Sequence, residues 1–265
     1  MITSGLSHWP AIALSTDTSP SAPAGTIYVV YDNDPHNGSG LPTQGDIRLS
    51  YTKDEGVTWS TPLVFANSGG TVQWPWVAAG ANGNVSVVWY QGDQLTDPDN
   101  DSAASLPGGR PTNWSIGAAF ISGADTATPT VTTVNAVQLN DTLHPNGTIH
   151  VGQMCEGGTT CVATGQDRRL GDYFTNALDQ NGCVMIASGD TMRLSPPPLN
   201  QPLPNSLPLF IHQNSGPSLT TGADCALSAV VPEARWVPVI AALGAAMIGV
   251  TAWRRRRTRR GLTTA

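Results

Sequence analysis

The sequence has few charged residues and very little glutamate. Charged side chains make up 12% of the 265 residues, and the only glutamates are Glu55, Glu156 and Glu233. Residues 1–232 carry 18 acidic and six basic side chains, which makes this part of the chain strongly acidic. Because binding to phosphates needs a basic face, the composition argues against a nucleic-acid partner.

The sequence also lacks a recognisable metal-binding motif. Its four cysteines do not have zinc-site spacing and its five histidines are scattered, so no cofactor is expected. Two acidic loops, residues 32–34 and 97–101, offer oxygen ligands of the kind calcium prefers, but neither has the EF-hand pattern. Ordinary turn residues are therefore the main interpretation of both loops, with calcium as the alternative.

The cysteines suit an oxidising compartment. Of the three possible pairings, the most economical joins Cys155 to Cys161 and Cys183 to Cys225. Buried free thiols are the alternative.

An export signal is missing at the start, whereas an anchor is predicted near the end. The first nine residues have neither the basic nor the apolar region of a signal peptide. Residues 236–253 are uncharged and would span roughly 27 Å as a helix, which matches a bilayer core. The arginine-rich residues 254–265 follow, so the positive-inside rule places this tail in the cytoplasm and residues 1–232 outside. We therefore expect a single-pass cell-membrane protein whose true start lies upstream; a buried soluble helix is the alternative.

Glycine and proline are plentiful, with 28 and 21 residues, and internal repetition indicates many short strands. Residues 8–13 recur as residues 73–78, and each copy is followed by an apolar strand. A third copy runs from residues 169–174 to residues 182–188. The first copy predicts four strands at residues 8–13, 25–31, 47–51 and 63–65, and the second predicts four at residues 73–78, 83–89, 114–121 and 130–134. The third copy ends with residues 207–212.

The turn at residues 52–59 has a distinctive chemistry. The Asp54 carboxylate can accept hydrogen bonds from backbone N–H groups further along, and Gly56 can adopt the positive φ that the turn needs. The hydroxyls of Thr52 and Thr58 can satisfy the remaining backbone groups, and Trp59 supplies a large apolar anchor.

This Ser/Thr-x-Asp-x-Gly-x-Thr-Trp pattern resembles the Asp-box of the bacterial neuraminidase repeat, and hence the sialidase-like β-propellers. The resemblance implies an all-β fold with about three blades of a presumed six, and a chain that forms the C-terminal part of a longer exported protein. The expected domains are a partial propeller at 1–213, a juxtamembrane linker at 214–235, a transmembrane helix at 236–253 and a basic cytoplasmic tail at 254–265.

The resemblance also implies candidate site residues. Sialidases use arginines against the substrate carboxylate, a Tyr–Glu pair as nucleophile and an Asp as acid/base, which makes Arg169, Asp172, Tyr173 and Glu156 the candidates. The structural alternative is an ion pair between Arg169 and Asp172 that holds the blade. Four aromatic residues could form a sugar-stacking platform or could pack between blades: Tyr28, Tyr31, Trp89 and Tyr90.

The expected function is recognition of an extracellular glycan or protein by a membrane-anchored propeller module. One alternative is a glycoside hydrolase of the sialidase type whose other catalytic residues lie upstream, so the sequence leaves enzymatic activity open. The other alternative is a structural surface protein with no ligand.

Overall fold

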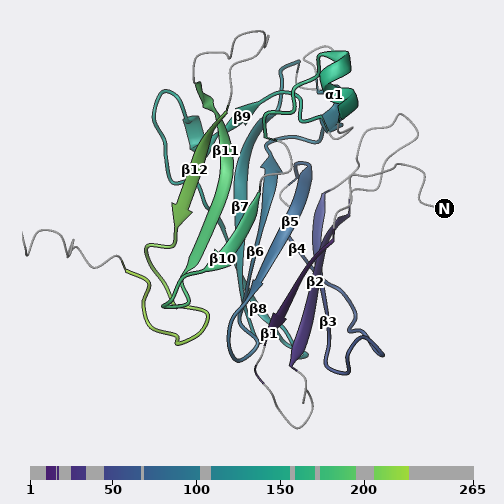
Figure 1. Cartoon of the computed structure of the whole chain (residues 1–265), viewed down its shortest axis with the longest axis vertical. Helices are drawn as coiled ribbons and strands as arrows, with labels where there is room; N and C mark the ends of the chain where they lie inside the picture. The colour runs from purple at the N-terminus through teal and green to yellow at the C-terminus, as the bar shows by residue number, and fades with distance from the viewer. Residues whose placement is uncertain are drawn as a thin grey trace, which may run out of the picture. The chain divides into compact units, whose positions relative to one another are not determined.

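The structure is a computed structural model that describes residues 10–15, 17, 25–33, 45–66, 69–101, 109–155, 159–170, 174–194 and 206–226. Within these ranges the fold is all-β, as the sequence predicts, with one short helix, α1 (Thr159–Thr164), and two single-turn 3₁₀ helices, η1 (Pro98–Asn100) and η2 (Pro145–Gly147). The strands form three antiparallel sheets (Figure 1).

Sheet 1 contains four strands in chain order, and sheet 2 contains four in chain order and a short fifth strand. Sheet 1 consists of β1 (Ala11–Ser15), β2 (Thr26–Asn33), β3 (Asp46–Thr52) and β4 (Leu63–Phe65). Sheet 2 consists of β5 (Val72–Ala79), β6 (Val85–Gly92), β7 (Asn113–Ser122) and β8 (Thr130–Asn135), and β9 (His150–Val151) also pairs with β7. The eight strands predicted from the repeats occur in the predicted order.

Sheet 3 has three described strands, β10 (Thr175–Leu178), β11 (Val184–Leu194) and β12 (Ser206–His212). Its first strand was predicted at residues 169–174 but is found at residues 175–178, because Arg169 and Leu170 belong to a turn. Residues 171–173 lie outside the described ranges.

Sheet 2 lies between the other two sheets, and its two faces belong to different cores. In β6, Val85, Val87 and Trp89 pack against sheet 1 residues such as Tyr28 and Ile47, which defines the first core. The alternate residues Val88 and Tyr90 pack in the second core, which contains Phe174, Val184 and Ile186 from the sheet 3 region. Because side chains alternate along a strand, the continuous apolar run of β6 is explained by burial on both faces. Stacked antiparallel sheets of this kind are compatible with a β-propeller.

The Asp-box turn between β3 and β4 makes the predicted hydrogen bonds. Thr58 donates to both Asp54 oxygens, from its N–H at 2.8 Å and its hydroxyl at 2.6 Å, and the Thr52 hydroxyl donates to Asp54 at 2.7 Å. Gly56 has a φ of +91° and donates its N–H to the Thr52 hydroxyl at 3.0 Å. The Thr58 hydroxyl and N–H, followed by the Thr52 hydroxyl, lower the pKa of Asp54 to about 2. Trp59 is 47% exposed, so it does not act as the buried anchor that the pattern suggests.

The corresponding turn of sheet 2, residues 122–129, lacks the Asp-box glycine and tryptophan. Its Asp125 forms an ion pair with Lys53 at 2.9 Å, which links this turn to the Asp-box of sheet 1. The Thr126 N–H and hydroxyl bond instead to the Gly123 carbonyl, at 3.0 and 2.7 Å. The Asp125 carboxylate therefore links two sheets, whereas the Asp54 carboxylate accepts hydrogen bonds within its own turn.

Residues 214–225 are part of the folded body, which corrects the linker predicted from residue 214. Leu219 is buried in the second core, and its carbonyl accepts the N–H of Ala81 at 2.9 Å. A disulfide joins Cys225 to Cys183, one residue before β11. Residues 214–225 resemble a linker because they are rich in glycine, serine and threonine. Their position is fixed by the Leu219 contacts and by the disulfide, which involve residues far away in the sequence.

The described residues include no helix that is long and apolar enough to span a bilayer. The predicted transmembrane segment, residues 236–253, and the basic tail lie outside the described ranges. The predicted upstream sequence is not tested by the described residues and stays a prediction.

Candidate functional site

Arg169, the main catalytic candidate, is held by a neighbouring carboxylate. Its Nε donates to both oxygens of Asp167 at 3.0 and 3.1 Å, and its Nη2 donates to Oδ2 at 2.6 Å. The Arg169 N–H also donates to Asp167 at 3.0 Å. Burial alone would raise the pKa of Asp167, but these hydrogen bonds outweigh it and lower the pKa. The guanidinium therefore has a resident bidentate partner.

Asp167, two residues upstream of Arg169, is a partner that was not predicted from the sequence. The predicted pair of Arg169 with Asp172 stays a prediction. Asp172, Tyr173 and Glu156 lie outside the described ranges.

Both cysteine pairs favoured by the sequence are disulfides in the structure. Cys155 pairs with Cys161, and Cys183 with Cys225, with sequence separations of 6 and 42 residues. The first closes the segment that leads into α1, and the second attaches residues 214–225 to sheet 3.

Three of the four aromatic residues proposed as a sugar-stacking platform are buried between sheets. Tyr28 and Trp89 lie in the first core, and Tyr90 lies in the second, where it stacks on Phe174 at a ring distance of 4.4 Å. The Tyr90 hydroxyl is hydrogen-bonded to Ser188 at 2.9 Å. These three side chains pack the fold and are not exposed for ligand stacking.

His144 is a buried residue whose role the sequence did not reveal. Its Nδ1 lies 3.0 Å from Asp141 and its Nε2 lies 2.9 Å from Asp190. Burial favours the neutral ring, but the hydrogen bonds to Asp190 and Asp141 outweigh it and raise the pKa of His144. These two contacts favour the protonated ring, in which both nitrogens are donors. His144 thus ties its loop to β11 and is poorly suited to act as a general base.

The acidic loop at residues 97–101, one of the two proposed for calcium, makes ordinary loop hydrogen bonds. Asp97 accepts the Asp99 N–H at 3.1 Å and caps the 3₁₀ helix η1, while Asp101 accepts the Thr112 N–H at 3.1 Å. Among the described residues, no group of three or more His, Cys, Asp or Glu is arranged to hold a metal ion.

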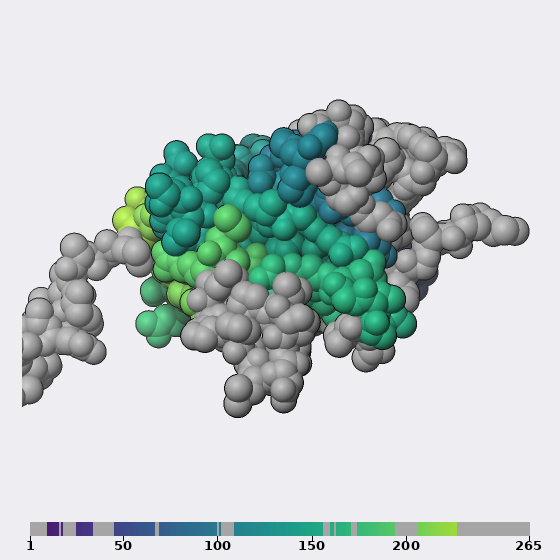
Figure 2. All heavy atoms as spheres, turned by 90° about the horizontal axis from the view of Figure 1, so that it is seen from above, coloured from purple at the N-terminus to yellow at the C-terminus, as the bar shows by residue number. Residues whose placement is uncertain are grey.

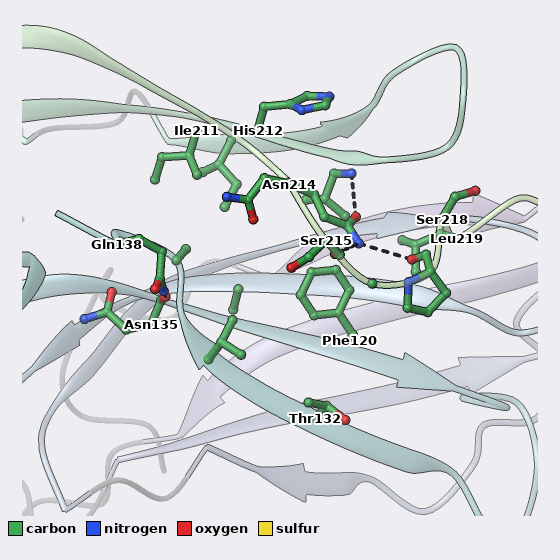
Figure 3. Close-up of a pocket in the computed structure, with 18 of the residues that line it drawn as sticks. Phe120, Thr132, Asn135, Gln138, Ile211, His212, Asn214, Ser215, Ser218 and Leu219 are labelled. Carbon is green, nitrogen blue, oxygen red and sulfur yellow. Dashed lines mark hydrogen bonds between the residues drawn. The ribbon is translucent and has the colours of Figure 1, made fainter. Parts of the chain in front are cut away.

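One feature capable of holding a ligand is a groove of about 960 Å³ between β8 and β12, which we call the β8–β12 groove (Figure 3). Thr130, Thr132 and Val134 form one wall on β8, and Leu209 and Ile211 on β12 lie across from them. Phe120, from the neighbouring strand β7, lies at its base. None of the described residues that line the groove is Asp, Glu, Lys or Arg. The groove therefore suits an uncharged and partly apolar ligand.

The groove runs beside an open sheet edge. β12 pairs with β11 on one side only, so its other backbone edge carries no described strand. The N–H of Gln213, which continues β12, donates to Val184 at 2.8 Å and so points towards β11. Because backbone groups alternate along a strand, the N–H groups of Phe210 and His212 point to the open edge. Pro208 has no N–H, which limits pairing further along the strand.

The end of the molecule opposite the Asp-box carries α1 and the loops of sheets 2 and 3. Figure 1 shows α1 at this end, and Figure 2 views the same end, where most of the coloured surface comes from residues in the teal to green part of the chain. One buried histidine at this end of the molecule is His150. His150 is 1% exposed and contacts the Thr191 hydroxyl and the Gln153 carbonyl, each at 2.8 Å. Its burial lowers the pKa of His150.

Comparison with known proteins adds no relative: no family model matches the chain, and no curated protein is significantly similar to it. The class that the described structure defines is an all-β protein built from stacked antiparallel sheets.

Proposed function

We propose that this chain is the membrane-anchored, C-terminal part of an exported sialidase-like β-propeller, and that it acts as a cell-surface recognition module. Residues 236–253 would cross the cell membrane, with the propeller outside and the arginine tail in the cytoplasm. Of the two ligand classes that the sequence suggests, glycans and proteins, we propose an extended protein segment. The β8–β12 groove is the observation that carries this choice.

The propeller assignment is supported by the Asp-box hydrogen bonds and by the face-to-face stacking of the sheets. It is also supported by the outer face of sheet 1, where Ile12, Leu14 and Val64 are 67%, 55% and 51% exposed. Three exposed apolar side chains on one sheet face favour a further sheet packing there, as successive blades do.

The groove favours a protein strand over a sugar. It combines uncharged walls with a sheet edge whose backbone donors at Phe210 and His212 are directed outwards. An extended peptide can add to such an edge through backbone hydrogen bonds, while alternate side chains enter the groove. Sugar binding often uses exposed aromatic faces, and three of the four aromatic residues proposed for that purpose, Tyr28, Trp89 and Tyr90, are buried.

Recognition is favoured over hydrolysis by the environment of Arg169. Its Nε and Nη2 already form a bidentate pair with Asp167, which neutralises the charge that a sialic-acid carboxylate would seek. A recognition module leaves a fluorogenic sialoside uncleaved. Hydrolysis that is lost in the Arg169→Ala variant would contradict this proposal and support the sialidase alternative.

The binding test uses the full chain in lipid nanodiscs and a capped hexapeptide of alternating threonine and valine, titrated to millimolar concentration. We expect saturable binding that weakens at least tenfold in Phe210→Asp, which places a charge at the groove. Ile12→Asp is the matched control, because Ile12 is as exposed as Phe210, at 67% and 65%, but lies on sheet 1. Equal binding by the native chain and by Phe210→Asp, or binding of glycans alone, would contradict the proposal.

A further inference from the structure

The second strands of the three sheets, β2, β6 and β11, come from the repeated part of the sequence. Residues 25–31, 83–89 and 182–188 align without a gap, so each strand places side chains at equivalent positions. Because side chains alternate along a strand, these positions divide into two faces. We call the face that contains Val30 and its equivalents the forward face, and the face that contains Val29 and its equivalents the backward face.

The same two kinds of face meet twice inside the chain. Val30, on the forward face of sheet 1, lies in the first core with Val87, on the backward face of sheet 2. Val88, on the forward face of sheet 2, lies in the second core with Ile186, on the backward face of sheet 3. Sheets 1 and 2 are therefore joined through the same positions of the repeat as sheets 2 and 3.

The backward face of sheet 1 has no partner among the described sheets. Ile12 and Leu14 lie on this face, where they pair with Val29 and Ile27, and they are 67% and 55% exposed. The strand register places six apolar or aromatic side chains on the face: Ile12, Leu14, Ile27, Val29, Tyr31 and Val64. This face of sheet 1 therefore resembles the backward faces that are buried in sheets 2 and 3.

The forward face of sheet 3 also has no partner among the described sheets. Ala187, the equivalent of Val30 and Val88, is exposed on it, and its register partner Phe210 is 65% exposed. The register places five apolar side chains on the face: Ala177, Met185, Ala187, Pro208 and Phe210. The described body thus ends in one unmatched backward face and one unmatched forward face, which are the two halves of its internal contact.

We propose that the forward face of sheet 3 in one copy packs on the backward face of sheet 1 in a second copy. This contact repeats between chains what the chain makes twice within itself, and it is head-to-tail because it joins two different surfaces. It removes the exposed side chains of Ile12, Leu14 and Phe210 from water. The inference rests on the proposed function, because it names the sheet that packs on sheet 1.

The test measures the mass of full-length chains in detergent micelles by sedimentation equilibrium. Leu14→Asp places a charge on the sheet 1 face, and Ala187→Asp places one on the sheet 3 face. We expect the native chain to associate as its concentration rises and each variant to lose this association, because every head-to-tail contact then includes one charged face. Val57→Asp is the matched control, because Val57 is 81% exposed in the Asp-box turn and lies on neither face.

An equimolar mixture of the two variants is the decisive sample. The intact sheet 3 face of Leu14→Asp can meet the intact sheet 1 face of Ala187→Asp, so the mixture should form dimers and nothing larger. Dimers in the mixture also show that both variants fold. Association of either variant by itself, or a mixture that stays monomeric while the native chain associates, would overturn the head-to-tail contact.

The inference and the proposed function fail in different ways. Neither Leu14 nor Ala187 lines the β8–β12 groove, so both variants should bind the hexapeptide as the native chain does. Peptide binding by a native chain that stays monomeric would overturn the second copy, leave both faces to a sheet from outside the 265 residues, and keep the recognition function. Association in the expected pattern without peptide binding would overturn the recognition function and keep the head-to-tail contact.

Discussion

Removing the Cys183–Cys225 disulfide should destabilise the body much more than removing Cys155–Cys161. The two bonds close loops with sequence separations of 42 and 6 residues. A disulfide stabilises the folded state because it restricts the unfolded chain. For these loop lengths the stabilisation is about 4 kcal/mol for Cys183–Cys225 and about 2 kcal/mol for Cys155–Cys161. The longer loop contains β11, β12 and the residues that carry Leu219 into the second core, so its loss also frees packed structure.

The measurement is the thermal midpoint of two double variants, Cys183→Ser with Cys225→Ser and Cys155→Ser with Cys161→Ser, at one pH and protein concentration. For a domain of 150–250 residues, 1 kcal/mol shifts the midpoint by about 2–4 °C. The difference of about 2 kcal/mol therefore predicts a midpoint about 4–8 °C lower for the first variant than for the second. Equal midpoints, or a lower midpoint for the second variant, would refute the reasoning from loop length.

Three further predictions concern single side chains. Asp54→Ala should lower the thermal midpoint and leave peptide binding unchanged. In the native chain the contribution of Asp54 should be lost as the pH falls from about 4 towards about 2, because its folded pKa is about 2; lost binding at an unchanged midpoint would contradict a purely structural role. Gly117→Ala would place a Cβ 2.3 Å from the Trp89 ring and should cost about 1–3 kcal/mol in denaturant unfolding, whereas an unchanged midpoint would show that the ring moves aside freely. His144 has a raised pKa, so its stabilising contribution should be complete below about pH 6.5 and be lost as the pH rises through the folded pKa; a His144→Gln variant should lack this decline between pH 6 and 9, and the same decline in both chains would exclude His144 as its source.

The sequence predicted the strands of sheets 1 and 2 well because their signals are local. Alternating apolar residues and the Asn82–Gly83 hairpin, with φ values of +56° and +71°, determine structure within a few residues. The Asp-box is local too, since Asp54 bonds to groups two to four residues away.

The remaining features depend on distant partners that no local pattern shows. The pKa of His144 is raised mainly by its hydrogen bond to Asp190, which lies 46 residues away in the sequence. Residues 214–225 read as a linker, yet Leu219 packs beneath sheet 2 and Cys225 binds a cysteine 42 residues earlier. The groove could not be predicted, because its lining joins β8 to β12 and to residues 213–219, which lie far apart in the sequence.

The Cys183–Cys225 disulfide determines how a force applied at the C-terminal end of the described body would travel. A pulling force that enters at Ala226 would pass through the sulfur atoms into Cys183, at the start of the 11-residue strand β11. The 42-residue loop that the bond closes would carry almost none of the tension. Because β12 lies within that loop, the groove wall that it forms would keep its shape when the C-terminal end is pulled.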